Sequence, residues 1–439
     1  MINKVFIFLI FLSNLLFTSK DIQALKITEV NSVSGVRAYL FEDKKNPIVS
    51  VSFQFSGGAS YDPIDKLGLS KMVSLLLDEG AGNFSSFDFQ SRLENNGIRL
   101  NFNSTLDSFS GNLTTITANI DEAIKLLSLA ITSPRFDEEP ILRVKKQIET
   151  SIIVEEESPR YFANKKIYEL IYPDHPYGRS RNGTLETLEN ISKMDLANYV
   201  KTRFSKDNLI VGVSGDISPE QLSSLLDTVF GNLPNNTLND GVVSIISPKY
   251  FGTVVENRKF PQSVIIASSP GVSRDDKDWY AALVANHILG GGSFTARLMQ
   301  EIREKKGLAY SVGSSLVPYK YSNLLYASLG TKNESVAESI KILRHEWGKF
   351  QKDGISYEEL KLAKDYITGS WPLRFTSSQS IASILVSVQY NNLGINYLSD
   401  RNEIINSINL QQVDDIVKRI FDVKKLSFLI VGMPVGISP

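Results

Sequence analysis

The sequence has no cysteine and only three histidines among its 439 residues. Without cysteine the chain has neither a disulfide framework nor a thiol nucleophile, so its stability must come from hydrophobic cores. The histidines are His175, His287 and His345, and no two of them have the short spacing of a metal-binding helix. A histidine-based metal site would therefore need distant elements to converge.

The chain also lacks an excess of charge of either sign. Lys and Arg number 47 and Asp and Glu number 48, which gives a net charge of -1. This balance offers no electrostatic basis for binding nucleic acid. With 42% hydrophobic residues the sequence is typical of a globular protein, and 439 residues exceed what one core usually organises. We expect two or more domains and no nucleic-acid partner.

A long hydrophobic run stands at the N-terminus, where residues 5–17 follow a short basic end. This pattern is typical of a secretory signal peptide, which we place at residues 1–24. The run is too short for a comfortable bilayer span, which needs about 20 residues. We therefore expect a mature protein without a membrane span in a bacterial periplasm. The alternative is an inner-membrane protein anchored by an uncleaved signal.

Two stretches of the chain repeat the same order of predicted elements. A strand at residues 49–55 precedes an apolar helix at residues 68–80. About 200 residues later a strand at residues 263–268 precedes an apolar helix at residues 279–289. The matched order of seven elements favours an internal duplication over two unrelated α+β domains.

The duplication predicts the architecture. Alternating apolar and polar residues predict strand pairs at 98–118 and at 310–329. We predict an α+β fold of two tandem homologous domains, at residues 25–235 and 249–439, each a mostly antiparallel sheet packed by helices. The polar, turn-rich residues 236–248 are predicted to be the linker.

Three segments carry a resemblance to a known superfamily. They are the frame Gly57-Gly-Ala-Ser-Tyr-Asp-Pro63 before the helix at 68–80, the loop Tyr172-Pro-Asp-His-Pro-Tyr-Gly178, and the segment from Arg297 to Val312. Together they resemble the pitrilysin, insulysin and mitochondrial processing peptidase superfamily, over nearly the whole chain. The resemblance implies the pitrilysin-like metallopeptidase fold, with two such halves in each chain and often two chains around a closed chamber.

In that superfamily the helix carries an H-x-x-E-H motif, in which two imidazoles bind zinc and the Glu polarises a water. The resemblance places Lys71, Ser74 and Leu75 at these positions, and Ser151 at the third metal ligand, a Glu further along the chain. A lysine ammonium has no lone pair and leucine has no donor atom. All four positions are lost together, so we predict that this chain has no catalytic residue of its own and binds neither a metal nor another cofactor.

The segment from Arg303 to Tyr310 resembles the R-x6-Y element of the superfamily. In relatives these two side chains reach into the active site, hold the substrate carbonyl and help to stabilise the tetrahedral intermediate. An arginine stays protonated and a phenol donates a hydrogen bond, so both suit a developing oxyanion. The alternative is structural, with Arg303 exposed near a helix end, Gly307 as the C-cap and Tyr310 in the core.

The remaining candidates have structural interpretations. Gly290–Gly292 follows a helix and is predicted to be its C-cap rather than a phosphate-binding loop. Glu155–Glu157 is either a solvated helix end or part of a negative chamber wall that attracts basic peptides. His175 is predicted to be structural, His287 a hydrogen-bonded core residue and His345 an exposed helix residue.

These patterns predict a non-catalytic subunit of a heterodimeric zinc metallopeptidase. The partner would be a homologous catalytic subunit with H-x-x-E-H and its zinc, while this chain contributes Arg303 and Tyr310 and closes a chamber around an unfolded peptide. One alternative is a structural or peptide-binding module without a proteolytic role, like the core subunits of respiratory complexes. Another is an active zinc endopeptidase, which requires ligands that the sequence does not show.

Overall fold

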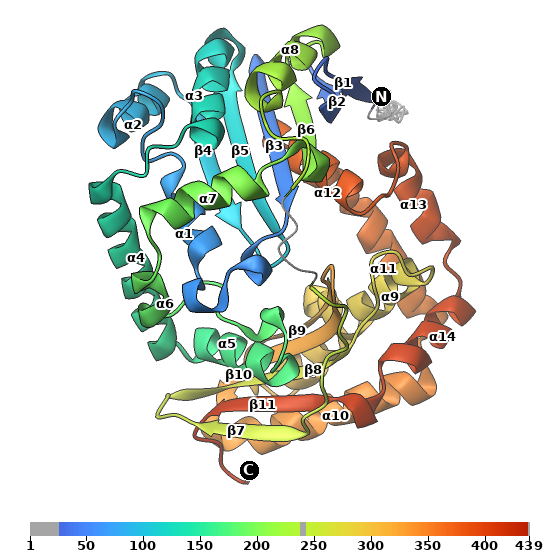
Figure 1. Ribbon diagram of the computed structural model, residues 1–439. Coiled ribbons are helices and arrows are strands. Elements are labelled where there is room, and N and C mark those ends of the chain that lie inside the picture. The colour runs from blue at the N-terminus through green and yellow to red at the C-terminus, as the bar shows by residue number, and fades with distance from the viewer. Residues whose placement is uncertain (1–25, 238–242, 438–439) are drawn as a thin grey trace, which may run out of the picture.

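The computed structural model describes residues 26–237 and 243–437 (Figure 1). The predicted signal peptide at residues 1–24 lies outside the described residues, as do residues 238–242 of the predicted linker. Within the two described ranges, every helix is too short or too polar to cross a bilayer.

The first half of the chain builds a six-stranded sheet with the order β1-β2-β6-β3-β5-β4. Its strands are β1 (Ile27–Asn31), β2 (Arg37–Glu42), β3 (Ile48–Ser56), β4 (Arg99–Ser104), β5 (Ser108–Ile116) and β6 (Leu209–Gly215). Only β2 and β6 run parallel, and the other neighbouring pairs are antiparallel.

The second half builds a five-stranded sheet with the order β7-β11-β8-β10-β9. Its strands are β7 (Thr253–Asn257), β8 (Gln262–Pro270), β9 (Ala309–Pro318), β10 (Asn323–Lys332) and β11 (Ser427–Gly432). Here β7 and β11 are the parallel pair. The order and the strand directions match those of β2-β6-β3-β5-β4, and this confirms the predicted α+β fold of two tandem domains.

Helices follow the strands in the same order in both domains. The first domain has α1 (Leu69–Leu76), α2 (Ser86–Asn95), α3 (Ile120–Thr132), α4 (Glu138–Glu157), α5 (Pro159–Ile171), α6 (Leu185–Glu189), α7 (Lys193–Arg203) and α8 (Pro219–Phe230). The second has α9 (Trp279–Asn286), α10 (Val336–Asp353), α11 (Tyr357–Gly369), α12 (Ser378–Tyr390), α13 (Tyr397–Ser407) and α14 (Leu410–Ile420). Capping boxes begin several of them, as at Ser218 and Ser356.

The helices α1, α3 and α8 of the first domain pack against its sheet, and α4 and α7 pack against α1. The alternating residues Val49, Val51, Phe53 and Phe55 of β3 point into this core and are at most 1% exposed. The residues between them, such as Ser52, point to the opposite face. That face is covered by the other domain.

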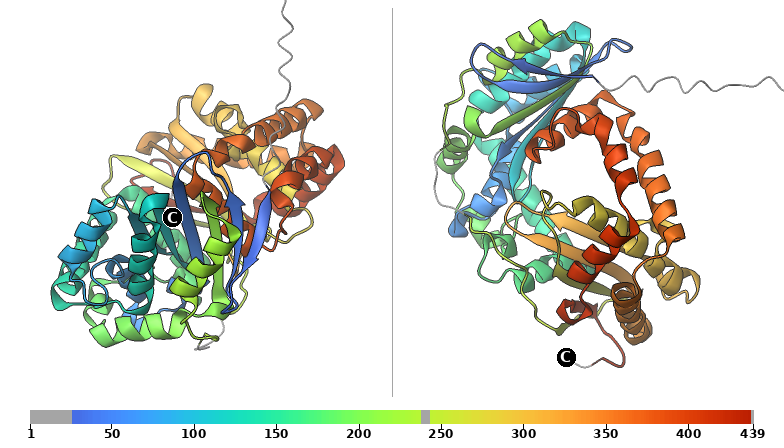
Figure 2. Two further views of the ribbon diagram at one scale, coloured as in Figure 1. Left: turned by 90° about the horizontal axis from the view of Figure 1, so that it is seen from above. Right: turned by 90° about the vertical axis from the view of Figure 1, so that its right-hand side faces the viewer.

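Helix α12 of the second domain lies across this opposite face (Figures 1 and 2). Gln379 donates a hydrogen bond of 2.7 Å to Ser52, and Gln389 donates one of 2.7 Å to the carbonyl of Val211. The approach is so close that a Cβ added at Gly212 would lie 2.4 Å from the carbonyl oxygen of Ala382. Only glycine fits at this point of β6.

Helix α5 of the first domain covers the second sheet in return. Its side chains Ile167 and Ile171 share a buried cluster with Ile266 of β8 and Leu429 of β11. Each domain thus supplies one helix to the sheet of the other, so the two halves are joined by extensive buried surfaces as well as by the linker.

The described parts of the predicted linker, residues 236–237 and 243–248, form neither helix nor strand. Residues 243–248 are nevertheless held by hydrogen bonds. The carbonyl of Ser244 accepts a bond of 2.9 Å from His175, and the Ile246 amide donates one of 2.8 Å to Tyr321.

Candidate functional site

Helix α1 stands where the zinc helix of the superfamily is expected, but it is shorter than the predicted helix at residues 68–80. Gly68 precedes the helix and has no side chain to cap it. The carboxylate of Asp62 takes that role and accepts hydrogen bonds from the Gly68 amide at 3.2 Å and the Ser70 hydroxyl at 3.0 Å. Met72, Val73 and Leu76 are fully buried, so the helix is firmly packed.

The three H-x-x-E-H positions on α1 hold Lys71, Ser74 and Leu75, none of which belongs to the motif. Lys71 is half-buried, and among the residues that the structure describes its ammonium has no hydrogen bond or ion pair. Burial lowers the pKa of Lys71, the Arg181 charge lowers it further and Glu155 opposes both effects. The buried Ser74 hydroxyl donates to the Lys71 carbonyl at 2.8 Å. Leu75 packs against the core of the first domain.

The third ligand position lies on α4. Ser151 is exposed, whereas the neighbouring Ile152 packs against the core. Ile152 continues the face that buries Val144 and Ile148, because the three residues are spaced by one turn. Neither Ser151 nor Ile152 carries a carboxylate.

These residues do not fit a zinc ion. Leucine has no lone pair to donate, and the lysine places a positive charge where a cation would bind. In residues 26–237 and 243–437, His, Cys, Asp and Glu nowhere gather in a group of three that could hold a metal. Glu155 is the carboxylate whose charge raises the pKa of Lys71. Both of its oxygens accept a hydrogen bond of 3.1 Å from the side-chain amide of Asn182.

The glutamates of the predicted charged helix end differ from one another. Glu155 is bound to Asn182, Glu156 pairs with Lys165 at 2.5 Å, and Glu157 is exposed. The run is therefore only partly a solvated helix end. Two of its three carboxylates are used in contacts to neighbouring segments.

In the second domain the C-cap is Lys305 and not Gly307, which lies two residues further on and reverses the chain. The π-helical turn Met299–Glu304 ends before Lys305, with the Gly307 amide bonded to the Arg303 carbonyl at 2.8 Å and the Leu308 amide to the Ile302 carbonyl at 3.0 Å. The Gly307 bond is that of an αL motif, and Gly307 takes the left-handed φ of +63° that it requires. The turn sends the chain back into β9.

The residues Arg303 and Tyr310 are brought together by this turn. The Arg303 guanidinium lies over the Tyr310 ring, 5.1 Å from its centroid, and over the Phe294 ring at 4.8 Å. Tyr310 is 85% exposed on β9, which is an edge strand of its sheet. The structural alternative that placed Tyr310 in the core is therefore wrong, because its side chain points away from the sheet's buried face.

Phe294 was not anticipated from the sequence. It lies two residues after Gly292. Gly290 and Gly291 belong to the π-helical turn His287–Gly291 that follows α9, and Gly292 is the C-cap of that turn. The predicted helix at 279–289 is thus α-helical only to Asn286. The available signal was an aromatic residue two positions after a run of three glycines. Phe294 is 56% exposed.

The three histidines lie apart. His175 is buried, donates to the Ser244 carbonyl at 2.9 Å and accepts from the Tyr177 amide at 3.2 Å, which confirms its structural role; burial lowers its pKa. His345 is exposed on α10, as predicted. His287 is not a hydrogen-bonded core residue: it is half-buried, and within the described residues it makes no hydrogen bond but stacks 5.0 Å from Tyr366.

Comparison with known proteins agrees with this geometry. Residues 37–185 match the family model described as "Insulinase (Peptidase family M16)", and residues 190–367 match "Peptidase M16 inactive domain". The "Non-peptidase homolog YmxG" of Helicobacter pylori is 28% identical over 430 residues, which cover 97% of this chain and 98% of that protein. An "Uncharacterized zinc protease YmxG" of Bacillus subtilis is 23% identical over 88% of this chain and 94% of that protein.

Solved structures show the same fold. A peptidase M16 inactive domain from Pseudomonas fluorescens superposes with a TM-score of 0.88 at 23% identity, covering 94% of this chain and all of that one. A protease from Helicobacter pylori superposes with a TM-score of 0.82 at 18% identity, covering 92% and 99%. The two family matches together span most of the sequence, and the zinc-ligand positions have lost their chemistry. This chain therefore belongs to peptidase family M16, and its H-x-x-E-H positions hold no metal-binding side chains.

Proposed function

We propose that this chain is the non-catalytic subunit of a heterodimeric zinc metallopeptidase. A homologous catalytic subunit with an intact H-x-x-E-H helix would supply the zinc. This chain would supply Arg303 and Tyr310 and close a chamber around an unfolded peptide. Its N-terminal signal-like segment favours the periplasm as the place where the two subunits meet.

The observation that carries this proposal is the contrast between the two halves of the expected active site. On α1 the catalytic groups are replaced by Lys71, Ser74 and Leu75, and the helix is used for packing. On the second domain Arg303 and Tyr310 are kept in a stacked, exposed cluster with Phe294. An aromatic ring that is 85% exposed contributes little to the folding of its own chain.

The chemistry of the cluster suits a role toward a peptide bound elsewhere. The guanidinium of Arg303 and the phenol of Tyr310 are hydrogen-bond donors that can meet a carbonyl oxygen as it becomes negative. Tyr310 lies on the edge strand β9, where a partner surface can approach, and Arg303 lies over its ring. An extended peptide would pair with a sheet edge of the catalytic subunit, a mode that makes few demands on its sequence.

A second candidate is a peptide-binding module that works without a peptidase partner. The similar protein from Helicobacter pylori is called a non-peptidase homolog, which favours a role without hydrolysis. In that case the cluster of Phe294, Arg303 and Tyr310 would be a contact surface only. The two candidates differ in whether this chain changes the rate of a catalytic partner.

The test is a reconstitution with a catalytic M16 subunit from the same source. Zinc content and cleavage of a quenched, unstructured peptide are measured for each chain alone and for the mixture. We expect this chain alone to hold no stoichiometric zinc and to be inert, and to raise the activity of the partner. Arg303→Ala or Tyr310→Phe should reduce that gain about tenfold or more.

Matched controls separate this effect from a general loss of structure. Arg344 also lies over an aromatic ring, 4.5 Å from Phe428, and Tyr357 is 74% exposed on α11. Arg344→Ala and Tyr357→Phe should leave the gain unchanged. If the mixture is no more active than the partner alone, the subunit proposal fails and the peptide-binding candidate replaces it.

A further inference from the structure

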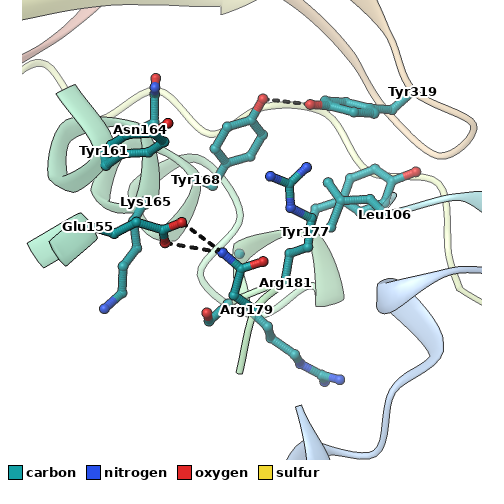
Figure 3. Close-up of a pocket in the computed structure, with 13 residues that line it drawn as sticks. Leu106, Glu155, Tyr161, Asn164, Lys165, Tyr168, Tyr177, Arg179, Arg181 and Tyr319 are labelled. Atoms are coloured by element: carbon teal, nitrogen blue, oxygen red, sulfur yellow. Dashed lines mark hydrogen bonds between the residues drawn. The ribbon is translucent and has the colours of Figure 1, made fainter. Parts of the chain in front are cut away.

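A cavity of about 220 Å³ opens at the junction of the two domains, beside the converted zinc helix (Figure 3). The end of α4, helix α5 and the loop at residues 176–183 form most of its wall. Leu106 from the first domain and Tyr319 from the hairpin between β9 and β10 complete it. A space of this size accommodates one amino-acid residue rather than a large cofactor.

The apolar part of the wall is built from tyrosines that are already held in place. The hydroxyls of Tyr168 and Tyr319 lie 2.6 Å apart, and this bond joins the two domains. Tyr177 is buried, donates to the Asp107 carboxylate at 2.5 Å and packs its ring 5.1 Å from that of Tyr319. Tyr161 is 58% exposed at the same cavity. The wall is therefore preformed and needs little ordering to accept an apolar group.

The polar part of the wall has an excess of positive charge. Arg179 and Arg181 line the cavity, and neither guanidinium forms a hydrogen bond or ion pair with the residues that the structure describes. Figure 3 shows hydrogen bonds at Glu155 and at the tyrosine pair, and none at either arginine head. Lys165 also lines the cavity but is paired with Glu156. Glu155 is the negative group that faces this space.

Lys71 is a further positive charge near these residues. Its ammonium is close enough to Arg181 and Glu155 to respond to both charges. Fixed cations of the chain thus stand near the place where relatives of the superfamily hold a metal cation. Such a site can attract an anion but has no metal-bound water with which to attack it.

We propose that this cavity binds the free C-terminal residue of a peptide. The terminal carboxylate would be held by the guanidinium group of Arg181, whose planar fork matches a carboxylate, while Arg179 points away from the tyrosines and adds positive charge at the rim (Figure 3). An aromatic or aliphatic last side chain would lie against Tyr161, Tyr168 and Tyr319. The carboxylate of Glu155 would accept a backbone N–H of the same peptide, a group that inorganic phosphate lacks.

The proposal concerns this chain alone and does not depend on a catalytic partner. Binding of a labelled ten-residue peptide ending in Phe is measured by fluorescence anisotropy with the full mature chain. The same peptide with a C-terminal amide and one ending in Gly are compared with it. We expect the free acid to bind at least about tenfold more tightly than the amide, since charge-assisted hydrogen bonds are lost with the amide.

Two variants locate the site. Arg179→Gln combined with Arg181→Gln should remove the preference for the free acid, while the control Arg37→Gln, at an exposed position of β2, should keep it. Tyr161→Ala should reduce the preference for Phe over Gly. We expect each variant to fold, because all four positions are at least partly exposed. Circular dichroism verifies this.

Each outcome of these experiments either supports or overturns the proposed peptide site. Acid and amide binding equally, or a double variant that binds like the wild type, would overturn the proposal. Inorganic phosphate is added as a competitor at increasing concentration. If phosphate binds at the arginines while the peptide acid shows no preference over its amide, the site is an anion site of another kind and the peptide assignment is wrong.

Discussion

Asp62 and Ser70 are joined twice at the start of α1: the Ser70 amide donates to the Asp62 carboxylate at 3.2 Å and the Ser70 hydroxyl donates at 3.0 Å. Asp62 is only 3% exposed, and burial raises its pKa to about 7 against the lowering effect of these bonds. The residue that anchors the converted zinc helix therefore ionises near neutral pH.

This anchor predicts a pH dependence of stability. Because the folded pKa of Asp62 lies above its unfolded value, the folded state binds more protons between about pH 4 and pH 7, and its contribution to stability falls as pH rises through that window. The loss amounts to about 1.4 kcal/mol per pH unit at most. The free energy of unfolding in guanidinium chloride, measured at pH 5 and 7, should therefore decline more in the wild type than in Asp62→Asn. A decline of equal size in both proteins contradicts the prediction.

Because α12 approaches the first sheet closely, replacing Gly212 of β6 by alanine should destabilise the protein more than the same change at Gly330 of β10. Gly212→Ala should lower the free energy of unfolding by about 1–3 kcal/mol, because the new Cβ would meet the Ala382 carbonyl at 2.4 Å. Gly330 of β10 is the control, since a Cβ there meets nothing within 4 Å. Gly330→Ala should change the free energy by about 0.5 kcal/mol or less. Equal losses in both variants would mean that the domains are not held together by this contact.

At the αL turn before β9, a substitution should act through the backbone conformation and not through a steric clash. Gly307→Ala should cost about 1–2 kcal/mol, because the residue sits at φ +63° although no atom lies within 4 Å of its added Cβ. Gly369, at the end of α11, also has free space and has no left-handed φ. Gly369→Ala should be neutral or slightly stabilising. Chemical denaturation gives the free energy of unfolding of both variants. An unchanged free energy in Gly307→Ala would contradict this account.

If the H-x-x-E-H motif is restored on α1 by mutation, the packing of α4 predicts which of its residues could supply the third zinc ligand. Lys71→His, Ser74→Glu and Leu75→His are combined with a glutamate at either position 151 or position 152. Ile152 lies on the face of α4 that packs against the core, whereas Ser151 is exposed. We expect the variant with Ile152→Glu to bind zinc at least about tenfold more tightly than the one with Ser151→Glu. Competition with a zinc chelator measures this, and the opposite order would restore Ser151 as the ligand position.

Much of the architecture was predictable because its signals are local. Alternating apolar residues in β3 and β8 and the repeated order of elements both depend on neighbours in the sequence. The loss of metal ligands was equally plain, since Leu75 cannot coordinate an ion in any conformation.

The arrangement of the candidate site was decided by contacts between distant segments. Nothing local to Phe294 indicates that Arg303 will lie between its ring and that of Tyr310, and the periodicity of β9 alone does not tell an exposed tyrosine from a buried one. The cavity beside α1 likewise needs Tyr319, which comes from a hairpin in the other domain.

The sequence by itself thus determined that the chain forms two α+β domains of the same topology and that Lys71, Ser74 and Leu75 stand at the H-x-x-E-H positions. Only the tertiary structure decided that α5 and α12 are exchanged between the sheets, that Tyr310 is exposed, and that Arg179 and Arg181 face a shared cavity. The physical reason is one of range. Backbone periodicity and side-chain chemistry act within a few residues, whereas burial and charge neighbourhoods arise only when both domains are packed together.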